Sequence, residues 1–137
     1  MVDEAHPDAD LAVPILDARR GEFFLGFFRP NPGEGRGQFV AQGEGLVLKP
    51  QALSAFLEER LRPGQRVTCL ARAHDRLAWG LLDVLPKSLR WQSVPGLLVG
   101  AIARLALEAQ RQGRLQSPGE LDAYYIRRPD AEINWRG

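Results

Sequence analysis

The sequence predicts a mixed α/β fold, in which helices cover the faces of one sheet. Two apolar runs flank a short polar turn between residues 13 and 28, which is typical of a pair of strands. After residue 50, stretches with helical apolar spacing alternate with short apolar runs. The chain has 137 residues, of which 45% are hydrophobic and 26% charged, so we expect a single domain with one core.

The composition argues against several classes of protein. The formal net charge of +1 provides no broad attraction to nucleic acid or to a membrane surface. Cys69 is the single cysteine, so the chain cannot form an internal disulfide, and we expect a reducing, cytoplasmic location. No apolar run approaches the roughly 20 residues that span a bilayer. The first ten residues lack the basic and apolar pattern of a secretory signal.

The first strands carry most of the apolar pattern. Residues 1–12 are acidic and show no period, so we interpret them as a flexible leader before a single lobe over residues 13–137. Two strands follow, joined by a turn at residues 17–22 in which Gly21 can adopt positive φ. Phe23 and Phe24 begin a run that is apolar on both faces, which predicts a doubly covered strand in the middle of the sheet.

A third strand and the first helix come next. Residues 30–37 form a loop rich in proline and glycine, and residues 38–48 form a strand interrupted at Gly43 and Gly45. These three strands predict an antiparallel meander. Pro50 then begins a helix that ends before residues 63–64. Its apolar stripe consists of Leu53, Phe56, Leu57 and Leu61.

The second half alternates strands and helices. Residues 67–71 and 89–94 are strands, and Asp75 caps an intervening helix that reaches residue 85. Pro95 opens the longest helix, which ends near residue 113 and which we expect to be the one most enclosed by the sheet. We expect the inward leucines of the capped helix to be Leu77, Leu81, Leu82 and Leu85, and the inward face of the longest helix to be Leu98, Ile102, Leu105, Ala106 and Ala109. The order of strands and helices along the chain is that of a ribonuclease-H-like lobe, the half-domain of actin, sugar kinases and Hsp70.

Two stretches resemble one known family. Residues 15–24, ILDARRGEFF, resemble the hairpin that opens the C-terminal lobe of the TsaB (YeaZ) family, and residues 121–132, LDAYYIRRPDAE, resemble its C-terminal ending. Their separation also matches, so the resemblance extends over residues 12–132. It implies a C-terminal lobe without the family's glycine-rich N-terminal lobe. The sequence departs from the family at Lys49, at residues 71–75 and at Ala123, where a serine, a Gly-Asp-Gly turn and a proline are usual.

The resemblance implies a function for the chain. TsaB is a non-catalytic partner of TsaD, and with TsaE these proteins transfer a threonylcarbamoyl group to a tRNA adenosine. We therefore expect a scaffold that is not an enzyme and that works with a TsaD-like catalytic subunit and a TsaE-like ATPase. We expect no cofactor, with ATP or ADP only in the full complex, and only indirect contact with tRNA. The missing lobe also predicts an exposed apolar patch beside the first hairpin and a homodimer formed through it.

Catalytic chemistry has little support in the sequence. His6 and His74 are the two histidines and do not have a metal-binding spacing, so we expect no metal site. Cys69 lies five residues before His74, which leaves open a nucleophile and base, but a small buried hydrophobic residue is the favoured interpretation. A hydrolase of the glycoprotease type, a label long attached to the family, would need a catalytic constellation that the sequence does not show.

Two groups of residues are candidates for binding. The first is the hairpin turn, which occupies the position where kinase-like relatives hold phosphate and which contains Asp17, Arg19, Arg20, Gly21 and Glu22. Its arginines could meet a phosphate or a partner's carboxylate, although a structural turn is favoured. The second is the basic and aromatic tail, where Arg127 and Arg128 follow Tyr124 and Tyr125, aromatic residues that could stack on RNA. A tail packed onto the domain is favoured there, and a stand-alone nucleotide- or RNA-binding module remains the alternative.

Overall fold

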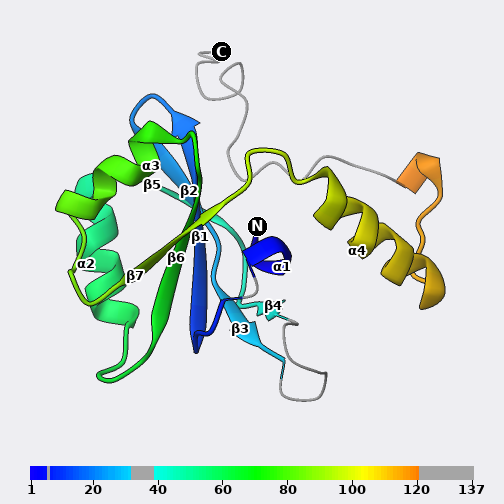
Figure 1. Ribbon diagram of the computed structural model, residues 1–137, viewed down its shortest axis with the longest axis horizontal. Helices are drawn as coiled ribbons and strands as arrows, with labels where there is room; N and C mark the ends of the chain where they lie inside the picture. Colours follow the sequence, from blue (N-terminus) through cyan, green and yellow to red (C-terminus); the bar gives the residue numbers. More distant parts are fainter. Residues whose placement is uncertain (6, 32–38, 121–137) are drawn as a thin grey trace, which may run out of the picture.

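The computed structural model describes residues 1–5, 7–31 and 39–120. Their strands form one mixed sheet, with the helices around residues 50–60 and 76–80 on one side of it (Figure 1). The strands are β1 (Leu11–Arg19), β2 (Glu22–Leu25), β3 (Phe28–Pro30), β4 (Phe39–Ala41), β5 (Leu46–Leu48), β6 (Val67–Arg72) and β7 (Arg90–Val94). The α-helices are α1 (Val2–Ala5), α2 (Pro50–Arg60), α3 (Arg76–Gly80) and α4 (Val99–Arg111), and the 3-10 turns are η1 (Leu81–Asp83) and η2 (Pro118–Glu120).

Strand β1 is the centre of the sheet. Its second half pairs antiparallel with β2, and its first half pairs antiparallel with β3. Strands β5 and β4 in turn pair with β2 and β3. On its other side β1 runs parallel to β6, which runs parallel to β7. The antiparallel meander is therefore confirmed, with breaks at residues 26–27 and 42–45 that divide its second and third strands.

One face of the sheet carries the main core. Every second residue of the central strands points to this face and is buried, as the period of a β-strand requires. Helix α2 covers it with Leu53 and Leu57, whose side chains are both 0% exposed. The predicted stripe of α2 is confirmed, since Phe56 and Leu61 pack at the margin. The buried residues contributed by the sheet are Leu11, Val13, Ile15, Phe23, Leu25, Val67, Cys69 and Ala71.

The opposite face is covered only in part. Val2 of α1 packs there with Ala12 and Leu70, and Phe28 and Phe39 lie against this small cluster. The first residues are therefore not a structureless leader, and the boundary expected at residue 12 falls inside β1. Local sequence could not indicate this, because the buried side chains at residues 2 and 12 meet partners far along the chain.

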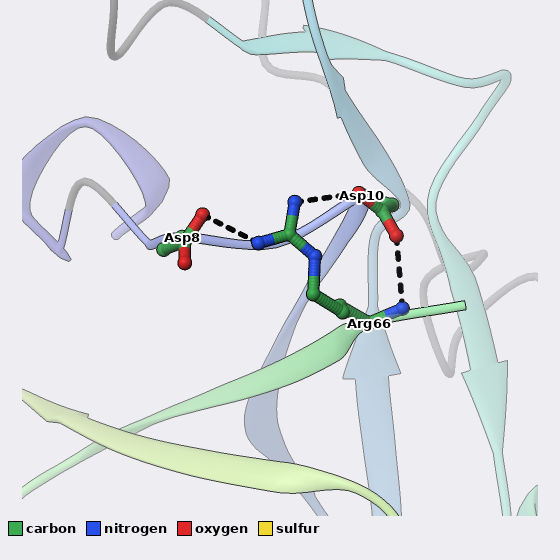
Figure 2. Close-up of polar contacts among 3 residues, drawn as sticks. All are labelled: Asp8, Asp10 and Arg66. Carbon is green, nitrogen blue, oxygen red and sulfur yellow. Dashed lines mark hydrogen bonds and ion pairs between the residues drawn. The ribbon is translucent and has the colours of Figure 1, made fainter. Parts of the chain in front are cut away.

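An ion-pair cluster fixes the segment before β1 to the start of β6. The guanidinium of Arg66 donates to Asp8 at 2.8 Å and to Asp10 at 2.9 Å (Figure 2). The backbone N–H of Arg66 donates to the second oxygen of Asp10 at 3.0 Å. Asp8 and Asp10, which the sequence placed in a flexible leader, thus link the segment before β1 to the start of β6, where the two strands begin to pair.

Strand β2 differs from its prediction. Phe23 and Leu25 are buried, whereas Phe24 is only half-buried, so β2 is fully covered on one face only. Its neighbours are β1 and β5, and the strand with three neighbours is β1. The prediction of a doubly covered strand in the middle of the sheet was therefore wrong for residues 23–28. The run of phenylalanines does not continue as one strand, because the backbone breaks at Gly26.

The helices in the second half agree with the sequence only in part. Asp75 caps α3 as predicted, and Leu81 and Leu85 are buried. Leu82 is exposed, because α3 ends at Gly80 and the chain tightens into η1, which changes the direction in which the side chains point. The one-turn helix expected near Pro118 is present as η2. The tail expected to be extended lies outside the described residues.

Helix α4 is the largest departure from prediction. The sequence indicated the helix most enclosed by the sheet, but Figure 1 shows α4 standing away from it. Ala101 is its buried residue, whereas Ile102 is 62% exposed and Leu105 is 51% exposed. An amphipathic pattern shows that a face can be buried, but it does not show which surface buries it. Among the described residues, no helix is long and apolar enough to cross a membrane.

Candidate functional site

Three parallel strands end at the same edge of the sheet. Strand β6 runs parallel to both β1 and β7, so the carboxyl ends of all three lie together. A backbone bond from the N–H of Ala73 to the carbonyl of Val94, at 3.0 Å, ties the ends of β6 and β7. Ligands of open α/β sheets bind beyond the carboxyl ends of the strands. This edge, with the β1–β2 turn beside it, is therefore the candidate site.

The β1–β2 turn is tighter than the sequence indicated. Strand β1 continues to Arg19 and β2 begins at Glu22, so the turn itself is Arg20 and Gly21. Arg19, Arg20 and Gly21 have φ of 65°, 56° and 73°, three successive left-handed residues. The pairing register shifts between Asp17 and Arg19, which is a β-bulge. Glycine avoids the steric cost of this conformation, whereas the two arginines bear it.

Asp17 is occupied by the turn itself. Its Oδ1 accepts a hydrogen bond from the backbone N–H of Arg19 at 2.6 Å. This bond stabilises the bulge, as short aspartate side chains often do in turns. The carboxylate is therefore part of the scaffold of the hairpin. The side chains of Arg19 and Arg20 are exposed at its tip.

Asp75 joins this turn to the end of β6. Its Oδ1 accepts from the N–H of Ala78 at 3.0 Å, which caps α3, and its Oδ2 accepts from the N–H of Asp17 at 3.1 Å. The side chain is buried, and its bond to Ala78 lies away from solvent, whereas its bond to Asp17 is partly buried. The cap could be predicted from the sequence. The bond to the hairpin could not, since it links residues 58 positions apart.

Arg72 is a residue that the sequence analysis overlooked. It ends β6, and its carbonyl accepts a hydrogen bond from the indole N–H of Trp79 at 3.0 Å. Its Nε is buried and has no hydrogen-bond partner in the described part of the chain. Arg72 could have been found from the sequence, because it directly follows the apolar run of residues 67–71, at the end of a predicted strand. Arg72 therefore ends β6 with a cationic residue at the carboxyl edge of the sheet.

Cys69 and His74 do not form a catalytic pair. Cys69 lies in the core under α2, with 0% exposure, and burial raises the pKa of its thiol to about 12. His74 is exposed beyond the end of β6, where its ring lies against Gly96. A thiol with such a pKa is protonated at neutral pH and is a poor nucleophile. The interpretation of Cys69 as a small buried hydrophobic residue is confirmed.

The structure brings the first group of predicted site residues together and leaves the second untested. Asp17, Arg19, Arg20, Gly21 and Glu22 share the hairpin at the carboxyl edge. Arg127 and Arg128 lie outside the described residues, as does His6. Within residues 1–5, 7–31 and 39–120, no group of three or more histidine, cysteine, aspartate or glutamate side chains could hold a metal ion.

An apolar recess lies beside the hairpin on the less covered face of the sheet. It has a volume of about 400 Å³, and its walls come from β1, β2 and the breaks in the meander. Pro14, Leu16 and Phe24 point into this face and are half-buried. The sequence predicted an exposed apolar patch in this position, and the recess agrees with that prediction. Its proposed use in self-association is not tested by the fold.

Comparisons with known proteins agree on the fold. A protein from Pseudomonas aeruginosa described as uncharacterized with similarity to the peptidase YeaZ superposes with a TM-score of 0.60 over 92% of this chain and 56% of its own, at 18% identity. YeaZ from the same organism superposes with a TM-score of 0.59 over 89% of this chain and 54% of its own, also at 18% identity. No family model and no curated protein matches the chain. The chain thus spans about half the length of these solved structures, and its fold is like that of YeaZ.

Proposed function

We propose that this chain is a non-catalytic lobe of a TsaB-like subunit that supports a TsaD-like catalytic subunit in threonylcarbamoyl transfer to tRNA. The observation that carries the proposal is the YeaZ-like fold over 92% of the chain. The hairpin and ending motifs add to it, because they resemble the same family at the same separation. We assign the chain to the C-terminal lobe, with a ribonuclease-H-like arrangement and a cytoplasmic location.

The geometry of the carboxyl edge supports a structural role for the hairpin. Asp17 and Asp75 use their carboxylates on backbone N–H groups, so both are engaged in holding the turn. Arg19 and Arg20 are held at the tip, and a planar guanidinium suits a partner's carboxylate. We therefore propose that the tip of the hairpin contacts the TsaD-like subunit. A TsaE-like ATPase and tRNA would join only in the full complex, and nucleotide would bind there rather than to this chain.

A binding assay with purified components tests this function. The chain should capture the TsaD-like protein of the same organism in calorimetry, whereas ATP and a tRNA anticodon stem should give no heat with the chain alone. Arg19→Glu combined with Arg20→Glu should weaken capture at least tenfold, because it reverses two charges at the hairpin tip. Arg62→Glu is the matched control, since Arg62 is a cation at the opposite ends of the strands, before β6.

Three outcomes would overturn the proposal. Submicromolar binding of ATP or of the anticodon stem to the isolated chain would favour a stand-alone nucleotide- or RNA-binding module. Hydrolysis of a peptide by the chain alone would favour the glycoprotease-type enzyme. A complete absence of binding to the TsaD-like protein, with the chain folded by circular dichroism, would also remove the scaffold role.

A further inference from the structure

A second concave surface lies at the edge of the sheet opposite to the candidate site. It has a volume of about 460 Å³ and is found at the amino ends of β6 and β7. The segment between α2 and β6 forms one wall, and the turn before β7 forms the other. We call this surface the amino-edge pocket, and its lining consists of residues 61–67 and 88–90.

The wall before β6 is a turn that is closed by two hydrogen bonds. The backbone N–H of Gln65 donates to the carbonyl of Arg62 at 3.1 Å, and the side-chain Oε1 of Gln65 accepts from the N–H of Arg62 at 3.2 Å. Pro63 and Gly64 occupy the two central positions, and the φ of Gly64 is 78°, as a type II turn requires at the second of them. Because its oxygen is used in the turn, the side-chain amide of Gln65 keeps its N–H donors for a ligand.

The side chains that line the amino-edge pocket carry positive charge. Arg62, Arg66 and Arg90 line it, and its lining includes no carboxylate. Arg66 is already engaged, because its guanidinium contacts Asp8 at 2.8 Å and Asp10 at 2.9 Å (Figure 2). The side chains of Arg62 and Arg90 are exposed and have no partner among the residues that the structure describes. These two arginines therefore favour a ligand with negative charge.

The apolar part of the lining is aliphatic. Val67 and Leu89 are buried, and Leu61 is half-buried. Single-stranded nucleic acid is held by bases that stack on aromatic side chains, and this lining contains none. A carboxylate beside an aliphatic side chain matches both features of the pocket, because the planar fork of a guanidinium fits a carboxylate and the leucines offer an apolar surface.

We propose that the amino-edge pocket binds an acidic segment of a partner protein, in which glutamate or aspartate residues flank an aliphatic side chain. The acidic side chains pair with Arg62 and Arg90, and the aliphatic side chain packs on Leu61 and Leu89. The inference does not rest on the proposed function, because the contact with a TsaD-like subunit is proposed for the hairpin tip, at the other edge of the sheet. The two contacts can therefore succeed or fail separately.

NMR titration of the full chain with short peptides, blocked at both ends, tests this proposal. The peptide Glu-Leu-Glu should shift the amide signals of residues 61–67 and 88–90 and should bind about tenfold more tightly than Gln-Leu-Gln, which has the same shape without the charge. Glu-Gly-Glu should also bind more weakly, because it lacks the aliphatic side chain. Added salt should weaken the binding of Glu-Leu-Glu, since both arginines are exposed.

Two double variants separate the pocket from general attraction to positive charge. Arg62→Gln combined with Arg90→Gln should raise the dissociation constant of Glu-Leu-Glu about tenfold, and it leaves the backbone bonds of the turn in place. Arg111→Gln combined with Arg114→Gln is the matched control, because it removes the same charge from exposed positions in and after α4 and should leave the constant unchanged.

Four results would overturn the proposal. Equal weakening in the two double variants would mean that the peptide responds only to the net charge of the chain. Equal binding of Glu-Leu-Glu and Gln-Leu-Gln would exclude recognition of carboxylates, and a titration without shifts at the pocket would exclude binding there. Tighter binding of a uridine hexanucleotide at the same residues would assign the pocket to RNA instead.

Discussion

The buried carboxylate of Asp75 accepts hydrogen bonds from two segments that lie far apart in the sequence. One comes from Ala78, at the start of α3, and the other from Asp17, at the bulge of the first hairpin. The side chain therefore fixes the hairpin to the carboxyl end of β6. At the candidate site this bond adds a side-chain link between the bulge of β1 and the segment after β6, two strands that already pair along residues 11–14 and 67–70.

Replacing Asp75 should destabilise the chain more than an ordinary helix cap would. Asp75→Ala removes the cap and leaves the N–H of Asp17 without its acceptor, so we expect a loss of about 2–3 kcal/mol in the free energy of unfolding. Urea denaturation followed by circular dichroism measures it. Asp83→Ala is the control, because Asp83 is exposed in η1 and should change the free energy by less than about 0.5 kcal/mol. Equal effects at the two positions would contradict the connecting role.

Replacing Gly21 and Gly80 by alanine should change the free energy of unfolding in opposite directions. Gly21 has φ of 73°, so Gly21→Ala should cost about 1 kcal/mol of folding free energy through backbone strain alone. Gly80 has helical dihedrals and open space at its Cβ position, so Gly80→Ala should stabilise by about 0.4–1 kcal/mol. Thermal unfolding of the two variants checks the signs. A stabilising Gly21→Ala would mean that the turn does not hold its left-handed conformation.

Truncating a leucine to alanine should lower the free energy of unfolding much more in α2 than in α4. Leu57 of α2 is 0% exposed, so Leu57→Ala should cost about 2–5 kcal/mol. Leu107 of α4 is 54% exposed, and Leu107→Ala should cost less than about 0.5 kcal/mol. Chemical denaturation at low protein concentration measures both. A large loss for Leu107 would restore the expectation that the longest helix is enclosed by the sheet.

The ion-pair cluster before β1 should appear in the titration of Asp10. Hydrogen bonds from Arg66, first from its side chain and then from its backbone, lower the pKa of Asp10 below its ordinary 3.8. The stabilisation is therefore complete above pH 3.8 and is lost as the pH falls through the lowered value. NMR titration should show the pKa of Asp10 rising towards 3.8 in Arg66→Gln. Because the pair is exposed, added salt should weaken the effect, and an unchanged pKa in the variant would exclude the ion pair in solution.

The thiol of Cys69 should be inert in the folded chain. Burial raises its pKa to about 12 from an ordinary 9.0, so the thiol stays protonated at pH 8 and is also out of reach. An alkylating reagent should label it only after denaturation, as mass spectrometry can show. The raised pKa also predicts stability that is complete below pH 9 and declines as the pH rises towards 12, because the unfolded thiol ionises first. Rapid labelling of the native chain would contradict both expectations.

The sequence by itself determined the elements whose cause is local. Pro50 and Leu53 fixed the start and the buried face of α2, and Asp75 fixed the cap of α3, because these effects act within one or two helical turns. The turn at Gly21 and the break at Gly43 were predictable for the same reason, since both glycines have positive φ. The composition of the hairpin also indicated its tip as a candidate for binding, and this stays a prediction.

Only the tertiary structure decided how these elements meet. It placed β1 rather than β2 at the centre of the sheet, made the first residues part of the fold through Arg66, and tied Asp75 to Asp17. It also left α4 exposed, although its apolar period is as regular as that of a core helix. The physical reason is the same in each case. Hydrophobic burial is non-directional, so a pattern shows that a face avoids water, while the topology of the chain determines which surface can reach it.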